Sequence, residues 1–265
     1  MKLSICLAVY NEVENLHYAM DSVRDFGDEV VVVDGGSDDG TIAALERYGK
    51  RVRILHADNP PMFHKNKQKA LDAAKGEWIL QLDADEAVSE GLKEEIRQVI
   101  GSPDSLDAYR IPRLNYFLGR FLRKGGQYPD YTIRLYKRGS AYFPCESVHE
   151  QVAVAGGEER IGTLKHDLLH YADPGFERYL MRWNRYTSMD AMVLRKELQA
   201  RGKKLGIPDF LNYFLVQPVR WFLLTYIRHK GFMDGFPGFV FSLFSAIRFW
   251  VIYVKTWHNH GKKSP

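Results

Sequence analysis

The first hundred residues alternate short apolar runs with segments whose apolar residues recur at helical spacing. Residues 3–9 and the four valines at 30–33 form apolar runs without polar alternation, which is typical of strands covered on both faces. Residues 52–55 and 78–82 predict two further strands. Helical spacing falls between these runs, at residues 16–23, 41–48 and 65–74. This order predicts an α/β fold with a mostly parallel sheet.

A capped helix and two more strands are predicted after this region. Ser89 precedes an acidic turn and apolar residues at helical spacing, which predicts a helix that ends near Gly101. Residues 108–114 and 132–136 have the composition of strands. We therefore assign residues 1–170 to one α/β domain.

From Pro174 onward the sequence changes to long helical patterns. A helical stretch comes first, and two apolar, aromatic segments follow at 209–228 and 236–257. The second approaches the ~20 residues that span a bilayer, but Arg248 inside it costs roughly 2.5–3.5 kcal/mol on insertion scales. We therefore expect residues 171–265 to form a helical region that lies in the membrane interface. The alternatives are a buried helical hairpin, an oligomer interface and a true transmembrane span.

Composition narrows the classes of function. The chain has 37 Lys plus Arg against 33 Asp plus Glu, and this net charge of +4 is too small to indicate a nucleic-acid partner. Cys6 and Cys145 show no CxxC spacing, so neither a disulfide framework nor a zinc site is predicted. The N-terminal apolar run meets Asn11 and Glu12 and does not resemble a signal peptide. We expect a cytoplasmic protein.

Polar residues follow three of the predicted strands, at the edge where open α/β sheets bind ligands. These are residues 10–12, 34–41 and 83–86. The GxGxxG and GxxxxGK[ST] patterns are both missing from the sequence, so a dinucleotide fingerprint and a P-loop are not indicated. Any nucleotide must therefore bind in a different mode.

The triplet Asp83-Ala84-Asp85 is a candidate metal site. Carboxylates at the tip of a buried strand lose hydration unless a cation or hydrogen bonds compensate. Their oxygens suit Mg²⁺ or Mn²⁺, which also take phosphate oxygens as ligands. Alone the triplet is a weak signal, since acidic pairs at strand ends also cap helices. The role of Asp34 is also left open by the sequence. It could cap a helix, form a turn or accept a hydrogen bond from the N–H of a base.

Three motifs occur in order, at residues 8–12 (AVYNE), 33–41 (VDGGSDDGT) and 76–86 (GEWILQLDADE). Further pieces follow at 134–139 (RLYKRG), 148–150 (VHE) and 231–235 (GFMDG). With these motifs the chain resembles glycosyltransferase family 2, of the Rossmann-like fold called GT-A, and in particular its lipopolysaccharide core beta-glucosyltransferase-like branch. The resemblance covers nearly the whole chain.

The resemblance implies that a nucleotide-sugar donor binds at the ends of the predicted strands. Ala8, Tyr10 and Glu12 would line the nucleoside pocket. Asp34 would contact the base, and this contact fits uracil best. Asp85 would be the direct ligand of a divalent cation, Mn²⁺ or Mg²⁺.

Other residues would act on the ribose and the phosphates of the donor. The resemblance places Asp83 on the ribose and beside the metal. Lys67 lies in a segment where the family often has basic residues near the donor; the alternative is a solvated helix face. Arg134 would clamp phosphate, because a guanidinium matches phosphate oxygens bidentately, although an exposed strand arginine is equally ordinary.

Inverting glycosyl transfer also requires a base on the acceptor hydroxyl. Glu150 falls where related enzymes carry their catalytic acid residue, with Glu146 as the fallback, and His149 would touch the diphosphate or the metal. The alternatives are an ordinary surface glutamate and a structural histidine. Because the motif reads His-Glu where the family more often has Glu-Asp, the roles at 149 and 150 stay open.

Together with the apolar C-terminal segments, the resemblance implies a metal-dependent, inverting glycosyltransferase on the inner face of a bacterial plasma membrane, bound peripherally to anionic lipid. It would move a hexose, with glucose from UDP-glucose as the favoured case, to an envelope glycan or a lipid-linked acceptor. One rival is a polyprenyl-phosphate glycosyltransferase, whose acceptor needs little base assistance. Another is a sugar-nucleotidyltransferase, which should carry a Gly-rich basic loop after the first strand, where residues 8–14 offer none. A non-catalytic membrane scaffold is opposed by the acids at 34, 83, 85 and 150.

Overall fold

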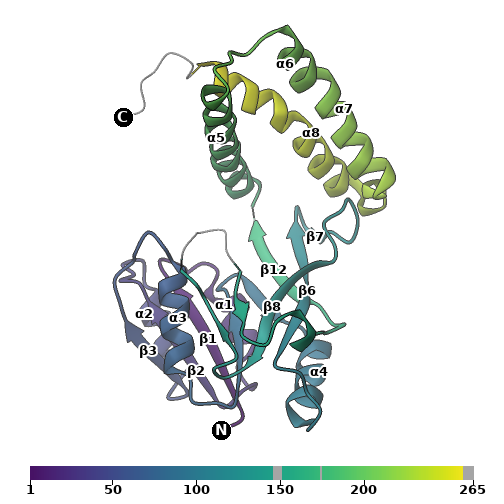
Figure 1. Ribbon diagram of the computed structural model, residues 1–265. Helices are drawn as coiled ribbons and strands as arrows, with labels where there is room; N and C mark the ends of the chain where they lie inside the picture. The colour runs from purple at the N-terminus through teal and green to yellow at the C-terminus, as the bar shows by residue number, and fades with distance from the viewer. Residues whose placement is uncertain (146–150, 174, 259–265) are drawn as a thin grey trace. The chain divides into compact units, whose positions relative to one another are not determined.

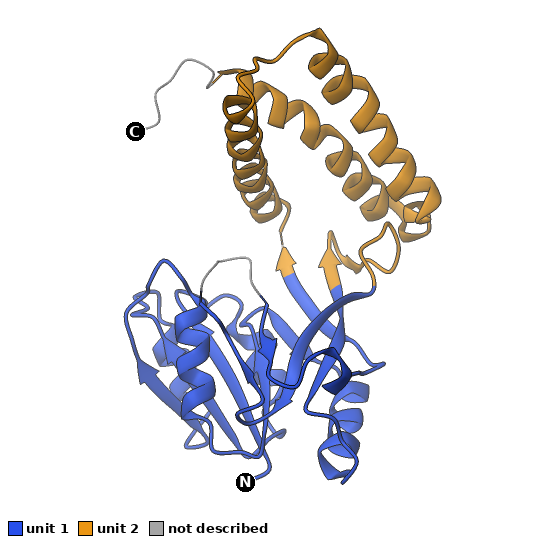
Figure 2. Ribbon diagram, in the orientation of Figure 1, with its two compact units in different colours: residues 1–114, 129–171 blue, residues 115–128, 172–265 orange. Residues whose placement is uncertain are grey.

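The structure is a computed structural model of the 265-residue chain and describes residues 1–145, 151–173 and 175–258 (Figure 1). The chain forms two compact units, which Figure 2 colours separately. Unit 1 comprises residues 1–114 and 129–171, and unit 2 comprises residues 115–128 and 172–265. Segment 115–128 therefore belongs to the same unit as the C-terminal helices.

The main sheet has the strand order β3-β2-β1-β4-β8-β6-β12-β5. Its first four strands are parallel, namely β1 (Leu3–Val9), β2 (Glu29–Asp34), β3 (Val52–His56) and β4 (Trp78–Leu82). The other strands of this order are β8 (Asp130–Lys137), β6 (Ala108–Phe117), β12 (Leu168–Asp173) and β5 (Glu86–Val88). Antiparallel pairing joins β4 to β8, β8 to β6 and β12 to β5. The predicted α/β fold class is confirmed.

The predicted helices of the N-terminal region also form. They are α1 (Leu16–Ser22), α2 (Thr41–Glu46), α3 (His64–Ala73) and α4 (Glu90–Gly101). The Oγ of Ser89 accepts a hydrogen bond from the amide of Leu92, as expected of an N-cap residue. Smaller elements complete this part of the chain: β7 (Arg120–Phe121), β9 (Ala141–Tyr142), β10 (Ala153–Val154), a 3-10 turn (Glu158–Arg160) and β11 (Ile161–Thr163).

Three of the parallel strands, β1, β2 and β4, are buried on both faces. On β1, Ile5 and Leu7 belong to one hydrophobic core, and Cys6 between them belongs to the other. On β2, Val30 and Val32 face the first core, whereas Val31 and Val33 face the second. Since successive side chains of a strand point to opposite faces, two covered faces require apolar residues at every position. This requirement explains the unbroken valine run.

Gly76 lies close to β1, and its lack of a side chain is required by packing. A Cβ at this position would lie 2.7 Å from the backbone nitrogen of Ser4 and 2.9 Å from the carbonyl oxygen of Trp78. Backbone atoms cannot yield without shifting the sheet. Gly76→Ala should therefore lower the free energy of unfolding by about 1–3 kcal/mol, measured by urea denaturation.

Gly101, the last residue of α4, provides a matched control for this substitution. A Cβ at Gly101 would meet no atom within 4 Å. Gly101→Ala should be neutral or slightly stabilising, because alanine is the better helix former. An equal loss of stability in both variants would contradict the steric explanation for Gly76.

Unit 2 contains a long helix followed by a helical hairpin. Helix α5 (Phe176–Ala200) matches the first helical stretch predicted after Pro174. The first apolar segment becomes α6 (Ile207–Leu211), a π-helical turn (Asn212–Val216), α7 (Gln217–Phe222) and a second π-helical turn (Leu223–Arg228). A 3-10 turn (Gly231–Asp234) leads into α8 (Gly235–His258), which is the second apolar segment.

Segment 115–128 is held in unit 2 by a small core and by Asp234. Phe117 and Leu122 pack with Tyr179 of α5 and Val240 of α8. The buried carboxylate of Asp234 accepts hydrogen bonds from the backbone amides of residues 123 and 124, at 3.3 and 2.7 Å. The motif at 231–235 therefore closes the core of unit 2.

The hairpin of unit 2 exposes many large apolar side chains. In length and composition the helical stretch Gly231–His258 is able to cross a bilayer, with a mean hydropathy of 1.6 and 28% of its most apolar window buried in the protein. Phe236 and Trp257 of α8 are 71% and 65% exposed, and Ile207 of α6 is 77% exposed. This surface is far more apolar than water-facing helices normally are.

Candidate functional site

The predicted site residues of unit 1 gather where β1, β2 and β4 end. In the sheet register Val9 of β1 lies opposite Asp34 of β2, and Leu7 of β1 lies opposite Leu82 of β4. The residues that follow these positions therefore leave the same edge of the sheet together. They include the predicted residue Tyr10, which is 46% exposed.

The loops after β1 and β2 are joined by a set of hydrogen bonds. The Asn11 amide donates to the Ser37 Oγ at 2.9 Å, and the Asn11 side chain both donates to and accepts from Asp38 at 2.9 Å. The Glu12 amide donates to the Thr41 Oγ1 at 2.9 Å. The loops that carry the first two predicted motifs are thus held together by hydrogen bonds. Tyr10 and the half-buried Ala8 lie next to these hydrogen bonds.

The two oxygens of the fully buried Asp34 carboxylate have different environments. Its Oδ2 accepts hydrogen bonds from the amides of Gly36 and Ser37, at 2.9 and 3.0 Å, which is the turn-forming role. Its Oδ1 is buried and has no hydrogen-bond partner among the described residues. Since an unsatisfied buried acceptor costs about 1–3 kcal/mol, this oxygen is suited to accept an N–H from a ligand.

Asp83 lies in a buried network of charges. Its Oδ1 is 2.5 Å from the Lys67 Nζ, and its Oδ2 is 2.6 Å from an Nη of Arg134. The same guanidinium group pairs at 2.6 Å with Glu86, which is fully buried. Glu86 in turn accepts a hydrogen bond from the backbone amide of Asp83 at 3.0 Å. Arg134 also donates a hydrogen bond to the side chain of Gln81.

Neither basic residue of this network lies on a solvated face. Lys67 is 8% exposed and Arg134 is 6% exposed. Lys67 therefore does not lie on a solvated helix face, and Arg134 is not an exposed strand arginine. Burial opposes ionisation of Asp83, yet the charges of Arg134 and Lys67 hold its pKa well below the usual 3.8. Both oxygens of Asp83 are thus engaged by cations of the protein. Whether Asp83 contacts ribose or metal stays a prediction.

Asp85 differs from Asp83 because its nearest side-chain partner is a histidine. The Oδ2 of Asp85 lies 3.6 Å from the Nε2 of His170 on β12, and the Tyr171 amide donates to the Asp85 carbonyl at 2.7 Å. Burial opposes ionisation of Asp85, but the neighbouring imidazole of His170 brings the pKa of Asp85 below 3.8. Asp85 is therefore ionised at neutral pH. The ring of Tyr171 stacks on that of Tyr18 at 4.0 Å and fixes this stretch of β12.

His170 was not predicted from the sequence. It stands as a single histidine in an apolar strand, and its position becomes apparent only because β12 pairs with β5, where His170 lies opposite Glu86. An imidazole nitrogen and a carboxylate oxygen at this separation are able to share one divalent cation. Among the described residues, no cluster of three or more Asp, Glu, His or Cys side chains is found. Two protein ligands nevertheless fit Mg²⁺ or Mn²⁺, which commonly complete their shell with phosphate and water.

Glu150, His149 and Glu146 lie outside the described residues. The roles predicted for them as catalytic base, diphosphate or metal contact, and fallback base stay predictions.

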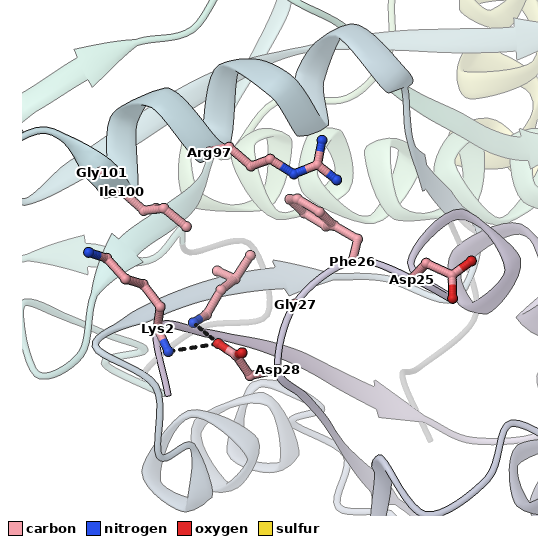
Figure 3. A pocket seen from close by; sticks show the side chains of 9 residues that line it. Lys2, Asp25, Phe26, Gly27, Asp28, Arg97, Ile100 and Gly101 are labelled. Atoms are coloured by element: carbon pink, nitrogen blue, oxygen red, sulfur yellow. Dashed lines mark hydrogen bonds between the residues drawn. The ribbon is translucent and has the colours of Figure 1, made fainter.

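A hollow of unit 1 lies at the amino end of β1, away from these residues (Figure 3). It has charges of both signs, and its Asp28 carboxylate is already used by the backbone amides of Lys2 and Leu3, at 2.7 and 2.9 Å. Arg97 packs over the ring of Phe26. These contacts serve the structure of the sheet edge, so this hollow is not part of the candidate site.

The sequence model of glycosyl transferase family 2 matches residues 4–147, which is more than half of the chain and includes all three ordered motifs. The chain belongs to glycosyltransferase family 2. Among curated relatives, this glycosyltransferase is 26% identical over 270 residues to the lipopolysaccharide core biosynthesis glycosyltransferase LpsC of Rhizobium meliloti, covering 100% of the chain and 95% of LpsC. It is 30% identical over 257 residues to an uncharacterized glycosyltransferase of Rickettsia felis, covering 92% and 86%.

Solved structures share the fold of this glycosyltransferase. The mannosyltransferase PcManGT of Pyrobaculum calidifontis, in complex with GDP-Man and Mn²⁺, matches with a TM-score of 0.52 at 15% identity over 99% of this chain and 88% of its own. S. aureus TarS 1-349 in complex with UDP matches with a TM-score of 0.51 at 16% identity over 100% and 93%. The predicted GT-A fold with a C-terminal apolar helix is thereby confirmed.

Proposed function

We propose that this glycosyltransferase moves a hexose, with inversion, from a nucleotide sugar to an envelope glycan or a lipid-linked acceptor, and that it requires Mn²⁺ or Mg²⁺. The observation that carries the proposal is the ionised Asp85 beside His170, next to the Asp83 network at the ends of the parallel strands. The name of LpsC supports a role in lipopolysaccharide core synthesis. We favour UDP-glucose as the donor.

The nucleoside would bind at the ends of β1 and β2. The unpaired Asp34 Oδ1 would accept a hydrogen bond from the N–H of uracil. An ionised carboxylate has no hydrogen to donate, so a base that presents only an acceptor at this position would not be bound. Tyr10 would present its exposed ring to the base, with Ala8 and Glu12 completing the pocket. This arrangement would orient the diphosphate toward the end of β4.

Asp85 and His170 would hold the cation, which supplies positive charge to the departing nucleoside diphosphate. Asp83 would hydrogen-bond the ribose while Lys67 and Arg134 fix its carboxylate in place. Since these two cations are already neutralised by Asp83 and Glu86, they would orient the donor more than attract it. Glu150 would take the proton from the acceptor hydroxyl.

We also propose that unit 2 docks peripherally on the inner, cytoplasmic face of a bacterial plasma membrane. Its support is the exposed apolar surface of α6, α7 and α8, which exceeds what a free water-facing surface normally shows. Lipid-linked and envelope acceptors reside at such a surface, so docking would bring the enzyme to its acceptor.

The decisive test is a donor panel with the purified protein in vesicles that contain anionic lipid. UDP-, GDP- and dTDP-sugars would each be assayed for binding and for sugar release, with Mn²⁺ and with EDTA. We expect UDP-glucose turnover that EDTA abolishes. Binding of none of these donors would refute the proposal, and pyrophosphate release from a nucleoside triphosphate and a sugar phosphate would identify the nucleotidyltransferase alternative.

The rival within the same class, transfer to a polyprenyl phosphate, has its own discriminating variant. A lipid phosphate needs little help from a base, whereas a sugar hydroxyl does. If Glu150→Gln abolishes transfer, the acceptor is a hydroxyl; full retained activity would favour the lipid phosphate.

A further inference from the structure

Exposed cations gather at the turn between the two arms of the helical hairpin, residues 228–236, which we call the hairpin tip. Two come from the tip and two from segment 115–128, namely Arg228, Lys230, Arg120 and Lys124. None of these four side chains forms an ion pair or a side-chain hydrogen bond with any residue that the structure describes. Cations that gather without acid partners repel one another and attract an anionic partner.

Contacts within unit 2 bring the two pieces of chain together (Figure 1). The Gly125 amide donates a hydrogen bond to the carbonyl of His229 at 2.9 Å. On the other side of the turn, a Cβ at Gly235 would lie 3.6 Å from the Nη1 of Arg120. The cations of segment 115–128 and those of the tip therefore belong to one surface.

The exposed charges of these two pieces of chain are all positive. Asp234 is the one acidic residue in the sequences 115–128 and 228–236. Its carboxylate is buried and accepts hydrogen bonds from the backbone amides of residues 123 and 124. The opposite end of the hairpin has charges of both signs, because its two lysines at 203 and 204 lie in the sequence between Glu197 and Asp209.

Lys230 has a backbone conformation that is unusual for a lysine. Its φ of 58° lies in the left-handed region, which glycine adopts without strain. Residues strained in this way cluster at sites where the side chain has a function. Glycine would form this turn more easily, so the fold gives no reason for a lysine here.

Large apolar side chains accompany the cations of the tip. Phe232, Met233 and Phe236 are 49%, 54% and 71% exposed. The tip also begins the helical stretch Gly231–His258, which has the length and composition to cross a bilayer. Basic residues beside exposed aromatic rings are the combination with which proteins bind anionic membranes, because the cations hold the head groups while the rings enter the acyl boundary.

This combination favours a lipid surface over other anionic partners. A second copy of the chain would bring the same cations together, because a two-fold interface uses the same patch of both subunits. The phosphates of a nucleic acid would match the cations, but the exposed apolar surface that continues from the tip along α6, α7 and α8 would stay in water. An anionic membrane satisfies the cations and the apolar side chains together.

We propose that the hairpin tip and segment 115–128 together bind the head groups of anionic phospholipids. The four cations lie among the head groups, and Phe232, Met233 and Phe236 insert between them. The inference rests on the membrane docking proposed above, and it assigns that docking to one end of the hairpin.

The test compares Lys230→Gly with Lys203→Gln, which removes the same charge from the opposite end of the hairpin. Lys203 is exposed, and the helical residues 207–228 separate it from the tip by about 30 Å. Binding of the full chain to vesicles of phosphatidylcholine, with and without phosphatidylglycerol, is measured at low and high salt. Lys230→Gly should bind the phosphatidylglycerol vesicles about fivefold more weakly at low salt, and high salt should remove this difference. Lys203→Gln should bind as the parent protein does.

Lys230→Gly also separates binding from folding. Glycine fits the left-handed conformation, and the relief of strain offsets the added freedom of the unfolded chain. Urea denaturation should therefore show no loss of stability. Weaker binding without a loss of stability is a result that a purely structural role of Lys230 would not give.

A second pair of variants tests the apolar side chains. Phe236 at the tip and Ile207 at the opposite end are similarly exposed, at 71% and 77%. Phe236→Ser should weaken vesicle binding roughly tenfold at both salt concentrations, because burial of a phenyl ring in lipid is not screened. Ile207→Ser should bind as the parent protein does.

The remaining outcomes separate the possible failures. Equal losses from variants at the two ends of the hairpin would overturn the tip as the lipid site. A dimer in solution that Phe236→Ser abolishes, measured by light scattering, would identify a second copy as the partner and would also overturn it. Failure of the parent protein to bind any vesicle would refute the membrane docking itself. Sugar release from UDP-glucose in solution tests the proposed transfer separately and should be equal in Lys230→Gly and the parent protein.

Discussion

Asp85→Asn should reduce the rate of sugar transfer by about 10²–10³-fold, the size of effect seen when a charge-stabilising group is removed from an active site. The substitution keeps the shape of the side chain but removes the negative charge that the proposed cation needs. The fold should be retained, since Asp85 contributes its carbonyl, not its carboxylate, to the hydrogen bond with Tyr171. Initial rates with UDP-glucose, measured across a range of Mn²⁺ concentrations, provide the readout.

Asp25→Asn serves as the matched control for this variant. Asp25 is exposed and lines the hollow at the other end of β1, so its transfer rate should equal that of the parent protein. His170→Gln should raise the Mn²⁺ concentration needed for half-maximal rate, with a smaller loss at saturation, because one of two ligands remains. Full activity of Asp85→Asn in the presence of EDTA would remove the metal role.

Arg134→Met should lower the free energy of unfolding by about 3–5 kcal/mol, the usual cost of leaving a buried charge without its partner. Arg134 is the shared partner of Asp83 and of the fully buried Glu86, and it also donates to Gln81. Methionine fills most of the volume but compensates neither carboxylate. Urea denaturation at pH 7 measures the loss.

Arg24→Met is the control, because its ion pair with Asp21 is exposed and should matter little. The pH dependence gives a second check. The pKa of Asp83 is lowered by folding, so its ion pairs stabilise the protein above its ordinary pKa of 3.8, and this contribution is lost as the pH falls below that value. The difference between parent and Arg134→Met should therefore shrink in acid. A difference that stays constant down to pH 2 would mean that packing, and not charge, explains the loss.

Much of the fold was predictable because local patterns determined it. The valine run of β2 and the helical spacing of α3 each reflect the burial of one short segment. The ends of β1, β2 and β4 could then be placed together, since parallel strands of one sheet share a carboxyl edge. The position of Asp34, Asp83 and Asp85 followed from that geometry.

What the sequence did not reveal depends on pairing between distant segments. β5 is a buried strand of three residues, and one of them is Glu86. No pattern of hydrophobic residues in the sequence indicates such a strand. The antiparallel pairing of β5 with β12 is what brings His170 to Asp85. Likewise, nothing within segment 115–128 indicates that its core partners come from α5 and α8. Such contacts require knowledge of the whole chain at once.

The assignment of segment 115–128 to unit 2 has a consequence for how the chain is made. Lys124 and the Asp234 carboxylate that binds its amide are 110 residues apart in sequence. At typical synthesis rates, Phe117 and Leu122 leave the ribosome on the order of ten seconds before the residues that cover them. During that interval these apolar side chains belong to no finished core and are open to chaperones or to other nascent chains. Unit 1 is therefore interrupted during synthesis by an apolar loop whose partner does not yet exist, and slowing elongation after residue 128 should increase aggregation of the newborn protein.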